Sequence, residues 1–391
     1  MRRAFLQGAG LATCLGGDLP GQVARLRDGK TSLGRVDLQL RETKVSIPYH
    51  LIAEPAYDSG AERLYTVLDR VIAEALGAAR LSAAALREMG IFVGSSSFEV
   101  GLSEQMFRRE LATCGTGIPV PLTGFGRIAD RVRERFGVHG PAYTFNTACT
   151  SSANALLYAS AMLESGWLEN AIVIGTEVFN FTSALGFHGL ELISPRGLRP
   201  FAADRSGLVL GEGVGALVIG AAEASAPPEQ ARFVIRGGAN LCDTHGVTAA
   251  NPDGSSIAEV LRAALEAARC DAREILAIKA HGTASQLNDE GEAAGIRAVF
   301  AELPPVAALK PYIGHTLGAC GVNEIILFCA ALEHGFCVAN PGICAEEGPL
   351  GIALRQRSDP LPDGSYLFNY FGFGGNNTAL ILSSALEDAA R

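Results

Sequence analysis

The chain has 391 residues, of which 48% are hydrophobic and 19% charged, and it contains 46 glycines. This composition describes a compact globular protein with much buried sheet and excludes a disordered or fibrous chain. The formal net charge of -9 argues against general nucleic-acid binding, and no apolar stretch is long and uninterrupted enough to span a membrane. The nine cysteines show no CxxC or Cys/His metal spacing, so we expect reduced thiols in a cytoplasmic protein, with neither disulfides nor a metal site.

Residues 1–17 imitate an export signal, because paired arginines precede an apolar stretch and Leu11-Ala12-Thr13-Cys14 has the form of a lipobox. The apolar stretch is interrupted by glycines, however, and runs directly into Asp18 and a patterned segment at 21–26. A β-strand followed by a glycine turn accounts for the same residues. We therefore expect a strand here and not a signal peptide.

Predicted strands and helices alternate along the rest of the chain. The predicted elements are a helix at 61–79, a strand at 91–93, a helix at 125–135, a strand at 143–145, a helix at 153–163, strands at 171–175, 216–219 and 233–235, a helix at 257–268 and a strand at 275–280. Strands that alternate with helices predict a layered α/β fold in which helices cover the sheets.

The helix predicted at 125–135 carries a stripe of arginines, Arg127, Arg131 and Arg135, at intervals of one helical turn. A solvated helix face accounts for such a stripe. A docking patch for an acidic carrier protein is the alternative that involves function.

The two halves of the chain contain short segments of similar sequence. The segment AMLESG has a later counterpart in AALEHG, and GEGVGALVI has one in GGNNTALIL, in the same order. We infer an internal duplication with its boundary near Pro227, which divides the chain into an N-terminal half at 1–226 and a C-terminal half at 227–391.

The segment TACTSS, with Cys149 at its centre, is the first candidate for chemistry. A strand is predicted before it and a helix closed by Gly166 after it, so Cys149 lies at a strand-to-helix turn. The helix dipole and unpaired backbone N–H groups at such a turn favour the thiolate. A buried cysteine that acts as a small hydrophobe is the structural alternative.

Three further segments look chemical. His281-Gly282-Thr283 follows a predicted buried strand, the segment GHTLGACG contains His315, and the segment FGFGGNN begins at Phe371. A single histidine is more often a hydrogen-bonded structural residue than a catalyst, and glycine-rich turns alone are weak evidence. The combination of all four segments carries the argument.

Together these segments resemble the β-ketoacyl-acyl-carrier-protein synthases of the thiolase superfamily. The resemblance spans nearly the whole chain and rests on five motifs in the family's order: TACTSS around Cys149, RPF to GEG at 199–213, HGT at His281, K to GH at 310–315, and FGFGG at Phe371. It implies a five-layered αβαβα sandwich built from two duplicated βαβαβαββ halves. It also implies an acyltransferase that makes a β-ketoacyl thioester, in fatty-acid or specialised polyene- or polyketide-like lipid synthesis.

The resemblance assigns roles to the matching residues. Cys149 would take the acyl group from a phosphopantetheine thioester, and its N–H and that of Phe373 would form the oxyanion hole. His281 and His315 would hold the carbonyl oxygen of a malonyl thioester while carbon dioxide leaves. Phe373 would also act as a gate to the acyl pocket.

Other matching positions would support these groups. Lys310 and Glu292 are expected to form a buried ion pair that orients the histidines, because burying either charge alone is costly. Thr283, Ser285 and Thr248 are expected to bind the pantetheine arm. The remaining supporting positions are Asp289, Phe371, Gly374 and Gly375.

The resemblance implies an acyl carrier protein as partner and a homodimer or a heterodimer with a homologous ketosynthase subunit. It implies no bound cofactor, since the substrate arrives on the carrier's phosphopantetheine arm, and neither nucleic acid nor membrane as a partner. Acyl chain length and pathway stay open. The chain departs from the common family pattern at Ser95-Ser96-Ser97, Phe145, Gln286-Leu287-Asn288 and Asn376-Asn377, which puts ordinary fatty-acid specificity in question.

Two alternatives stay open at this stage. A thiolase acting without decarboxylation would carry Asn where His281 stands and a second catalytic cysteine within 371–377, where the sequence has none. A chain-length-determining partner subunit usually lacks the nucleophile, so the intact Cys149, His281 and His315 argue against that role.

Overall fold

The computed structural model describes residues 2–40, 42–52, 60–114, 124–224, 231–248, 250–344, 346 and 348–384. Its large sheet takes strands from both halves of the chain. The N-terminal half supplies β1 (Arg2–Thr13), β4 (Gly90–Gly94), β5 (Ala142–Phe145), β6 (Asn170–Glu177) and β8 (Gly213–Glu223). The C-terminal half supplies β9 (Phe233–Cys242), β10 (Ile275–Lys279), β11 (Val306–Ala307), β12 (Ser365–Phe371) and β13 (Asn376–Ser384).

The strands of the two halves follow the same order in space. The N-terminal half runs β5-β4-β6-β8-β1 and the C-terminal half runs β11-β10-β12-β13-β9. When the five strands of each half are numbered by their order along the chain, both halves show the same spatial order: third, second, fourth, fifth, first. An internal duplication produces this shared order. The runs meet where β1 and β9 pair antiparallel, with Ala4 opposite Ile235 and Phe5 opposite Val234. The predicted boundary near Pro227 falls outside the described residues and stays a prediction.

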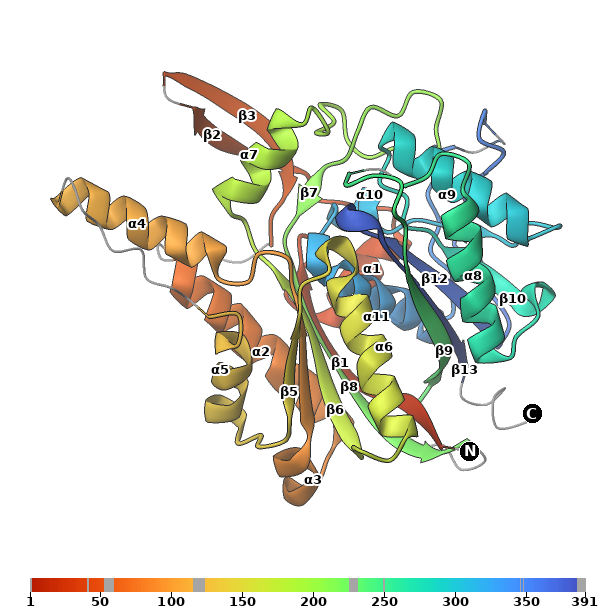
Figure 1. The fold of residues 1–391 in the computed structure, drawn as a ribbon, viewed down its shortest axis with the longest axis horizontal. Coiled ribbons are helices and arrows are strands. Elements are labelled where there is room, and N and C mark those ends of the chain that lie inside the picture. Colours follow the sequence, from red (N-terminus) through yellow and green to blue (C-terminus); the bar gives the residue numbers. More distant parts are fainter. Residues whose placement is uncertain are drawn as a thin grey trace.

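Helices cover the strands in layers, which confirms the five-layered αβαβα arrangement. The helix α2 (Gly60–Ala79) packs on β1 and β8, and α8 (Ser255–Ala268) packs on β9, β13 and α9 (Gln286–Val299). Between the two runs of strands lie α6 (Ser151–Glu164) and α11 (Cys320–Glu333), which contact each other (Figure 1). These two central helices are buried along most of their length because strands lie on both sides.

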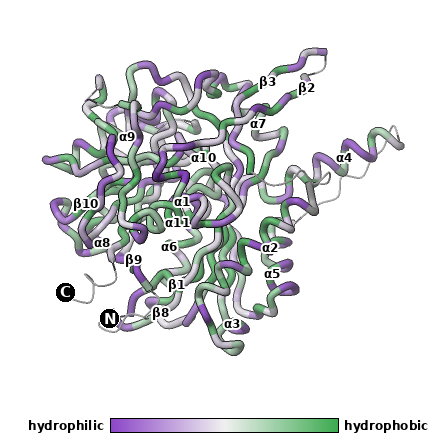
Figure 2. Tube along the Cα trace, turned by 180° about the vertical axis from the view of Figure 1, so that it is seen from behind, coloured by the Kyte–Doolittle hydropathy of each residue, from purple (hydrophilic) through white to green (hydrophobic). Residues whose placement is uncertain are grey.

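Shorter elements surround this core. The helices are α1 (Leu19–Arg27), α3 (Ala83–Glu88), α4 (Val100–Cys114), α5 (Arg127–Phe136), α7 (Phe181–Gly189) and α10 (Lys310–Ile313), with 3-10 turns η1 (Ala148–Thr150), η2 (Ala272–Glu274), η3 (Leu317–Ala319) and η4 (Phe373–Gly375). A second sheet joins β2 (Gly34–Leu40), β3 (Thr43–His50) and β7 (Leu210–Gly211). The β2–β3 hairpin and α4 project away from the layered body (Figure 1), and hydrophilic residues are frequent along both (Figure 2).

The structure confirms the strand predicted near the N-terminus. β1 is a long strand paired with β8 along its length, and Thr13 and Gly16 close a turn with backbone hydrogen bonds of 3.2 and 3.1 Å. Residues that resemble a lipobox therefore lie within this strand and its turn. In the part of the chain that is described, no helix is long and apolar enough to cross a membrane.

The arginine stripe of α5 is engaged within the molecule. Arg131 and Arg135 both approach the carboxylate of Asp69, at 2.5 and 3.4 Å, and Arg127 lies 3.2 Å from Glu99. These ion pairs explain the stripe as the contact between α5 and its neighbours. Arg127 and Arg135 stay more than half exposed, as a solvated helix face predicts, and the docking patch stays a prediction.

Candidate active site

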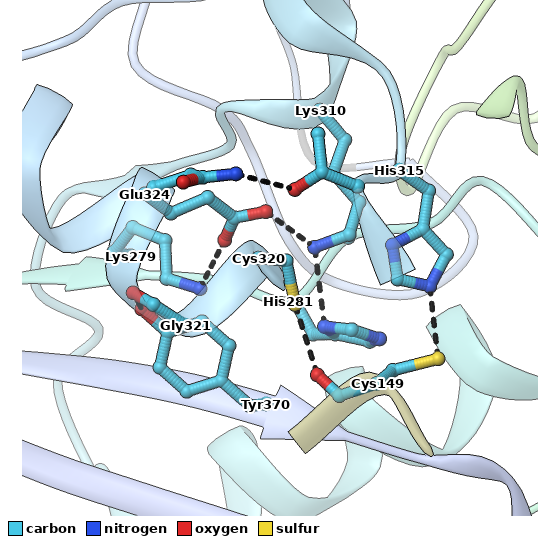
Figure 3. A network of polar contacts seen from close by, with 12 residues as sticks. Cys149, Lys279, His281, Lys310, His315, Cys320, Gly321, Glu324 and Tyr370 are labelled. Atoms are coloured by element: carbon cyan, nitrogen blue, oxygen red, sulfur yellow. Dashed lines mark hydrogen bonds and ion pairs between the residues drawn. The ribbon is translucent and has the colours of Figure 1, made fainter. Parts of the chain in front are cut away.

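Cys149 lies at the turn between β5 and α6, as predicted. The turn is η1, and Ala148 within it has a φ of 51°, a left-handed conformation that non-glycine residues rarely adopt. The Ser151 hydroxyl stabilises the turn by accepting from Thr147 N at 2.9 Å and donating to Ala148 O at 2.6 Å. The Cys149 side chain is only 5% exposed, and its Sγ lies 3.1 Å from Nε2 of His315 (Figure 3).

The thiolate expected from the helix N-terminus is wrong for the resting protein. Burial raises the pKa of the Cys149 thiol to about 11, although the charge of Lys310 and a hydrogen bond from the Phe373 N–H act in the opposite direction. Desolvation of a charged sulfur in this closed site is the largest of these effects. Cys149 therefore rests as a thiol, and His315 is the group placed to accept its proton.

The two predicted histidines come together beside Cys149. His281 follows β10 and His315 follows α10, and their rings meet edge-to-face at a centroid distance of 5.3 Å. Burial, and next the positive charge of Lys310, lower the pKa of both rings well below the ordinary value, so both are neutral. Nζ of Lys310 lies 3.1 Å from Nδ1 of His281. An ammonium can only donate, so Nδ1 accepts and Nε2 of His281 carries the proton.

The predicted ion pair between Lys310 and Glu292 is wrong. Nζ of Lys310 bonds instead to Oε1 of Glu324 at 2.8 Å, and both side chains are fully buried. Glu324 comes from α11, fourteen positions after Lys310, whereas Glu292 comes from α9 and bonds to the backbone of the His281 turn. Burial, the largest single effect, lowers the pKa of Lys310, but the charge and hydrogen bond of Glu324, together with smaller contributions from Cys320 and Glu292, raise that pKa overall.

Glu292 bonds to the backbone, and it acts on Lys310 only through its charge. Its two carboxylate oxygens accept the N–H groups of His281 and Gly282 at 2.7 and 2.8 Å, which fixes the turn that carries the histidine. Asp289, one turn earlier on α9, accepts from Phe201 N at 2.7 Å and Ala284 N at 3.1 Å. Both acids thus hold the loop around the site in place.

The serine turn at 95–97 also supports the site. The buried carboxylate of Glu177, at the end of β6, accepts from the backbone N–H groups of Ser96 and Ser97, each at 2.9 Å, and of Gly318 at 3.0 Å. The Ser96 hydroxyl adds a hydrogen bond of 2.7 Å. This carboxylate joins the end of β4 to the turn that follows His315, so the departure from a glycine-rich turn has a structural use.

A cavity of about 900 Å³, part of it open to solvent, reaches Cys149 and both histidines. Its further lining is Phe187, Leu190, Leu192, Leu208, Thr248, Ala250, Thr283, Ser285, Gln286, Leu287, Asn288, Phe371, Gly372, Phe373, Gly375 and Asn377. The three hydroxyl residues predicted to bind the pantetheine arm are all in this lining. The hydroxyls of Thr283 and Ser285 lie 2.9 Å apart.

Phe373, the predicted gate, stacks on Phe187 of α7 with a ring distance of 5.5 Å and an angle of 22°. Gly374 and Gly375 follow it with φ of 79° and 76°. At Gly375 a Cβ atom would lie 1.7 Å from the carbonyl oxygen of Asp243, so only glycine fits there. Phe371, the other aromatic residue of the motif, packs edge-to-face on the His281 ring with a centroid distance of 5.7 Å.

Glu324, Lys279 and Cys320 belong to the site but were not predicted. Glu324 and Lys279 are charged residues inside otherwise apolar segments. This pattern indicates a buried ion pair, since a buried charge requires a partner. Nothing in the sequence distinguishes Cys320 from the other apolar residues of its helix.

Comparison with known proteins agrees with this geometry. The family model "Beta-ketoacyl synthase, N-terminal domain" matches residues 60–225, and "Beta-ketoacyl synthase, C-terminal domain" matches residues 232–343. The chain belongs to the β-ketoacyl synthase family. Together the two matches cover more than half of the chain and contain Cys149, His281 and His315.

Two relatives of known sequence illustrate the similarity. The highly reducing polyketide synthase ALT1 of Alternaria alternata is 30% identical over 276 residues, which are 66% of this chain and 10% of that protein. The putative polyketide beta-ketoacyl synthase 1 of Streptomyces halstedii is 30% identical over 275 residues, 66% of this chain and 64% of that protein. The chain therefore spans about a tenth of the length of several curated relatives that it matches.

Solved structures resemble the whole chain. The ketosynthase ApeO in complex with its chain length factor ApeC, from Xenorhabdus doucetiae, matches with a TM-score of 0.84 and 25% identity, covering 98% of both chains. The ishigamide ketosynthase/chain length factor matches with a TM-score of 0.82 and 25% identity, covering 98% of this chain and 99% of the other.

Proposed function

We propose that this chain condenses an acyl group, held on Cys149, with a malonyl thioester in a decarboxylative Claisen reaction. The product is a β-ketoacyl thioester. The observation that carries the proposal is the convergence of the Cys149 thiol and the neutral rings of His281 and His315 at the inner end of one cavity.

In the first step the Cys149 sulfur attacks the carbonyl carbon of an acyl thioester. His315 Nε2, 3.1 Å from the sulfur, accepts the thiol proton and returns it to the departing pantetheine thiolate, so the ring ends the step neutral. The Phe373 N–H already donates to the sulfur at rest, and with the Cys149 N–H it is positioned for the oxyanion of the tetrahedral intermediate.

In the second step a malonyl thioester loses carbon dioxide and its electron pair passes to the thioester carbonyl as an enolate. The Nε2–H of His281 is a donor for that oxygen, because Lys310 occupies the opposite nitrogen. The first step leaves the proton of His315 on Nδ1, so His315 becomes a second donor once Nε2 takes up a proton from solvent and Nδ1 releases one. The enolate carbon then attacks the acyl-enzyme carbonyl, and the released Cys149 thiolate takes up one proton.

We infer that both substrates arrive on phosphopantetheine arms of acyl carrier protein, so no cofactor is bound to this chain. The apolar lining of the cavity beside hydroxyls at Thr283, Ser285 and Thr248 suits an acyl-pantetheine arm. A homologous ketosynthase subunit is the second partner that we infer. Two of the similar solved structures are described as pairs of ketosynthase and chain length factor.

Intact-mass measurement tests the proposal. The protein is incubated with acyl-carrier-protein thioesters of short, medium and long saturated chains and of one aromatic acid. We expect an acyl adduct on the wild type and on Cys242→Ala, which removes an exposed thiol, and no adduct on Cys149→Ala. A folded wild type that takes no acyl group from any donor would instead support the chain-length partner role, and purification with a homologous chain would then be checked.

A further inference from the structure

A second lysine is buried beside the site and has no role in the mechanism above. Lys279 is the last residue of β10, two positions before His281, and its side chain is fully buried. Its Nζ donates to Oε2 of Glu324 at 2.5 Å and to the backbone oxygen of Asn369 at 2.8 Å. It also lies 3.6 Å from the centre of the Tyr370 ring.

Glu324 therefore bridges two ammonium groups. Lys310 bonds to one carboxylate oxygen and Lys279 to the other (Figure 3). Around Glu324, two ammonium groups therefore share one carboxylate, and the buried Glu292 acts on both lysines through its charge. This leaves a local surplus of positive charge at the Glu324 contact. Burying such a charge is expensive, and a protein keeps it where the rest of the structure uses it.

We propose that Lys279 is a positioning residue of the condensation site, acting through Glu324 and Lys310 on both histidines. This inference rests on the proposed function and adds a residue to its machinery. Lys279 fixes the Glu324 carboxylate from the side opposite Lys310, so that Lys310 stays aimed at His281 Nδ1. Its charge supplies the surplus that disfavours imidazolium at either ring and favours the enolate in the same cavity.

The electrostatics around Lys279 are consistent with this role. Burial, and next the positive charge of Lys310, lower the pKa of His315. The positive charge of Lys279 lowers the pKa of His315 further, and it also lowers the pKa of His281. The ionisable groups around Lys279 on the elements packed against it are Glu324 and Cys320 on α11, Lys310 on α10, Tyr370 on β12, Glu292 on α9, and His281 and His315.

The charge of Lys279 also sets a pH window. Burial lowers the pKa of Lys279 to about 8, against the opposing attraction of Glu324. As pH rises through that value the surplus charge disappears, and enolate formation should slow. Without Lys279, the histidines lose a neighbouring like charge, so their pKa rises and the acidic limit of activity moves towards neutral pH.

The test measures malonyl-thioester decarboxylation and Cys149 acylation separately, across pH, for the wild type, Lys279→Met and Tyr370→Phe. The last variant is the matched control, because it keeps the ring under Lys279 and removes only a hydroxyl bonded to Gly321 O at 3.1 Å. We expect Lys279→Met to slow decarboxylation about tenfold, less than loss of a direct donor, and acylation much less. The alkaline limb near pH 8 should vanish only in this variant.

A readout that does not need catalysis separates this inference from the proposed function. Nitrogen-15 NMR of histidine side chains should show that His281 and His315 protonate at a higher pH in Lys279→Met than in the wild type. Unchanged histidine titration, or equal slowing of both half-reactions with an unchanged pH profile, would overturn the role. If Lys279→Met does not fold, Lys279→Gln replaces it. A wild-type decarboxylation profile without an alkaline limb would also overturn the proposed role of Lys279. Failure of acyl loading with altered histidine titration would reject the proposed function and leave the electrostatic role standing.

Discussion

The Cys320 thiol donates a hydrogen bond to the backbone carbonyl oxygen of Cys149, with a sulfur–oxygen distance of 2.9 Å (Figure 3). This contact joins the first turn of α11 to the turn that carries the nucleophile. Burial raises the pKa of Cys320 well above the ordinary value, so it stays a donor under all working conditions. Its function is therefore to hold the Cys149 peptide and not to react.

Replacing Cys320 tests that contact. Cys320→Ala leaves the Cys149 carbonyl without its donor, at a cost of about 1 kcal/mol, so we expect Cys149 acylation to slow about fivefold. Cys320→Ser keeps an O–H donor and should retain most of the rate. Stopped-flow acylation with one acyl thioester compares the three proteins, and an equal loss in both variants would contradict the hydrogen-bond explanation.

The pH dependence of Cys149 alkylation follows from its raised pKa. Because burial raises the pKa of this thiol to about 11, the thiolate fraction keeps growing throughout the neutral and mildly alkaline range. We expect the iodoacetamide rate at Cys149 to rise about tenfold per pH unit from neutrality without a plateau below pH ~10. Site-resolved mass spectrometry measures it. A plateau near neutral pH would show a stabilised thiolate and contradict the prediction.

Phe187 should control how the proposed gate opens. Phe187→Ala removes the ring on which Phe373 stacks, a contact of about 1 kcal/mol. Displaced positions of Phe373 then become several-fold more populated, so we expect bulky acyl thioesters to load faster relative to short ones. The ratio of the two acylation rates measures this effect. Phe187→Tyr preserves stacking and should preserve the ratio.

Glu292→Gln should destabilise the protein, since a buried amide cannot accept the N–H groups of both His281 and Gly282. Its NH₂ group would face a donor, at a cost of about 2 kcal/mol. Thermal denaturation should show a lower midpoint, whereas Glu259→Gln, at an exposed position of the neighbouring helix α8, should leave the midpoint nearly unchanged. Equal midpoints for the two variants would rule out this role for Glu292.

The order of elements and the positions of the nucleophile and both histidines could be predicted, because they depend on local periodicity and on motifs that stand at element ends. The strand predicted at 143–145 is β5, the helix predicted at 257–268 lies within α8, and Cys149 lies between strand and helix as expected. These features depend on short segments of chain, so the local sequence is enough to predict them.

The wrong predictions share a physical cause, since both depend on neighbours distant in sequence. Glu292 and Glu324 are similar acids at similar distances along the chain from Lys310, and only the packing of α11 beside α10 decides between them. The thiolate expected at Cys149 follows from the helix end alone. The surrounding chain that excludes water from the sulfur, and reverses the direction of the shift, comes from many segments.

The duplicated halves have divided the chemistry between them. The N-terminal half carries Cys149, while His281, His315, Lys310 and Glu324 all come from the C-terminal half, and the contact between α6 and α11 brings the two sets together. Neither repeat contains a complete reaction centre. A perturbation that loosens the packing between the repeats can therefore abolish turnover by separating Cys149 from the histidines, so acyl transfer serves as a sensitive reporter of how the two repeats dock.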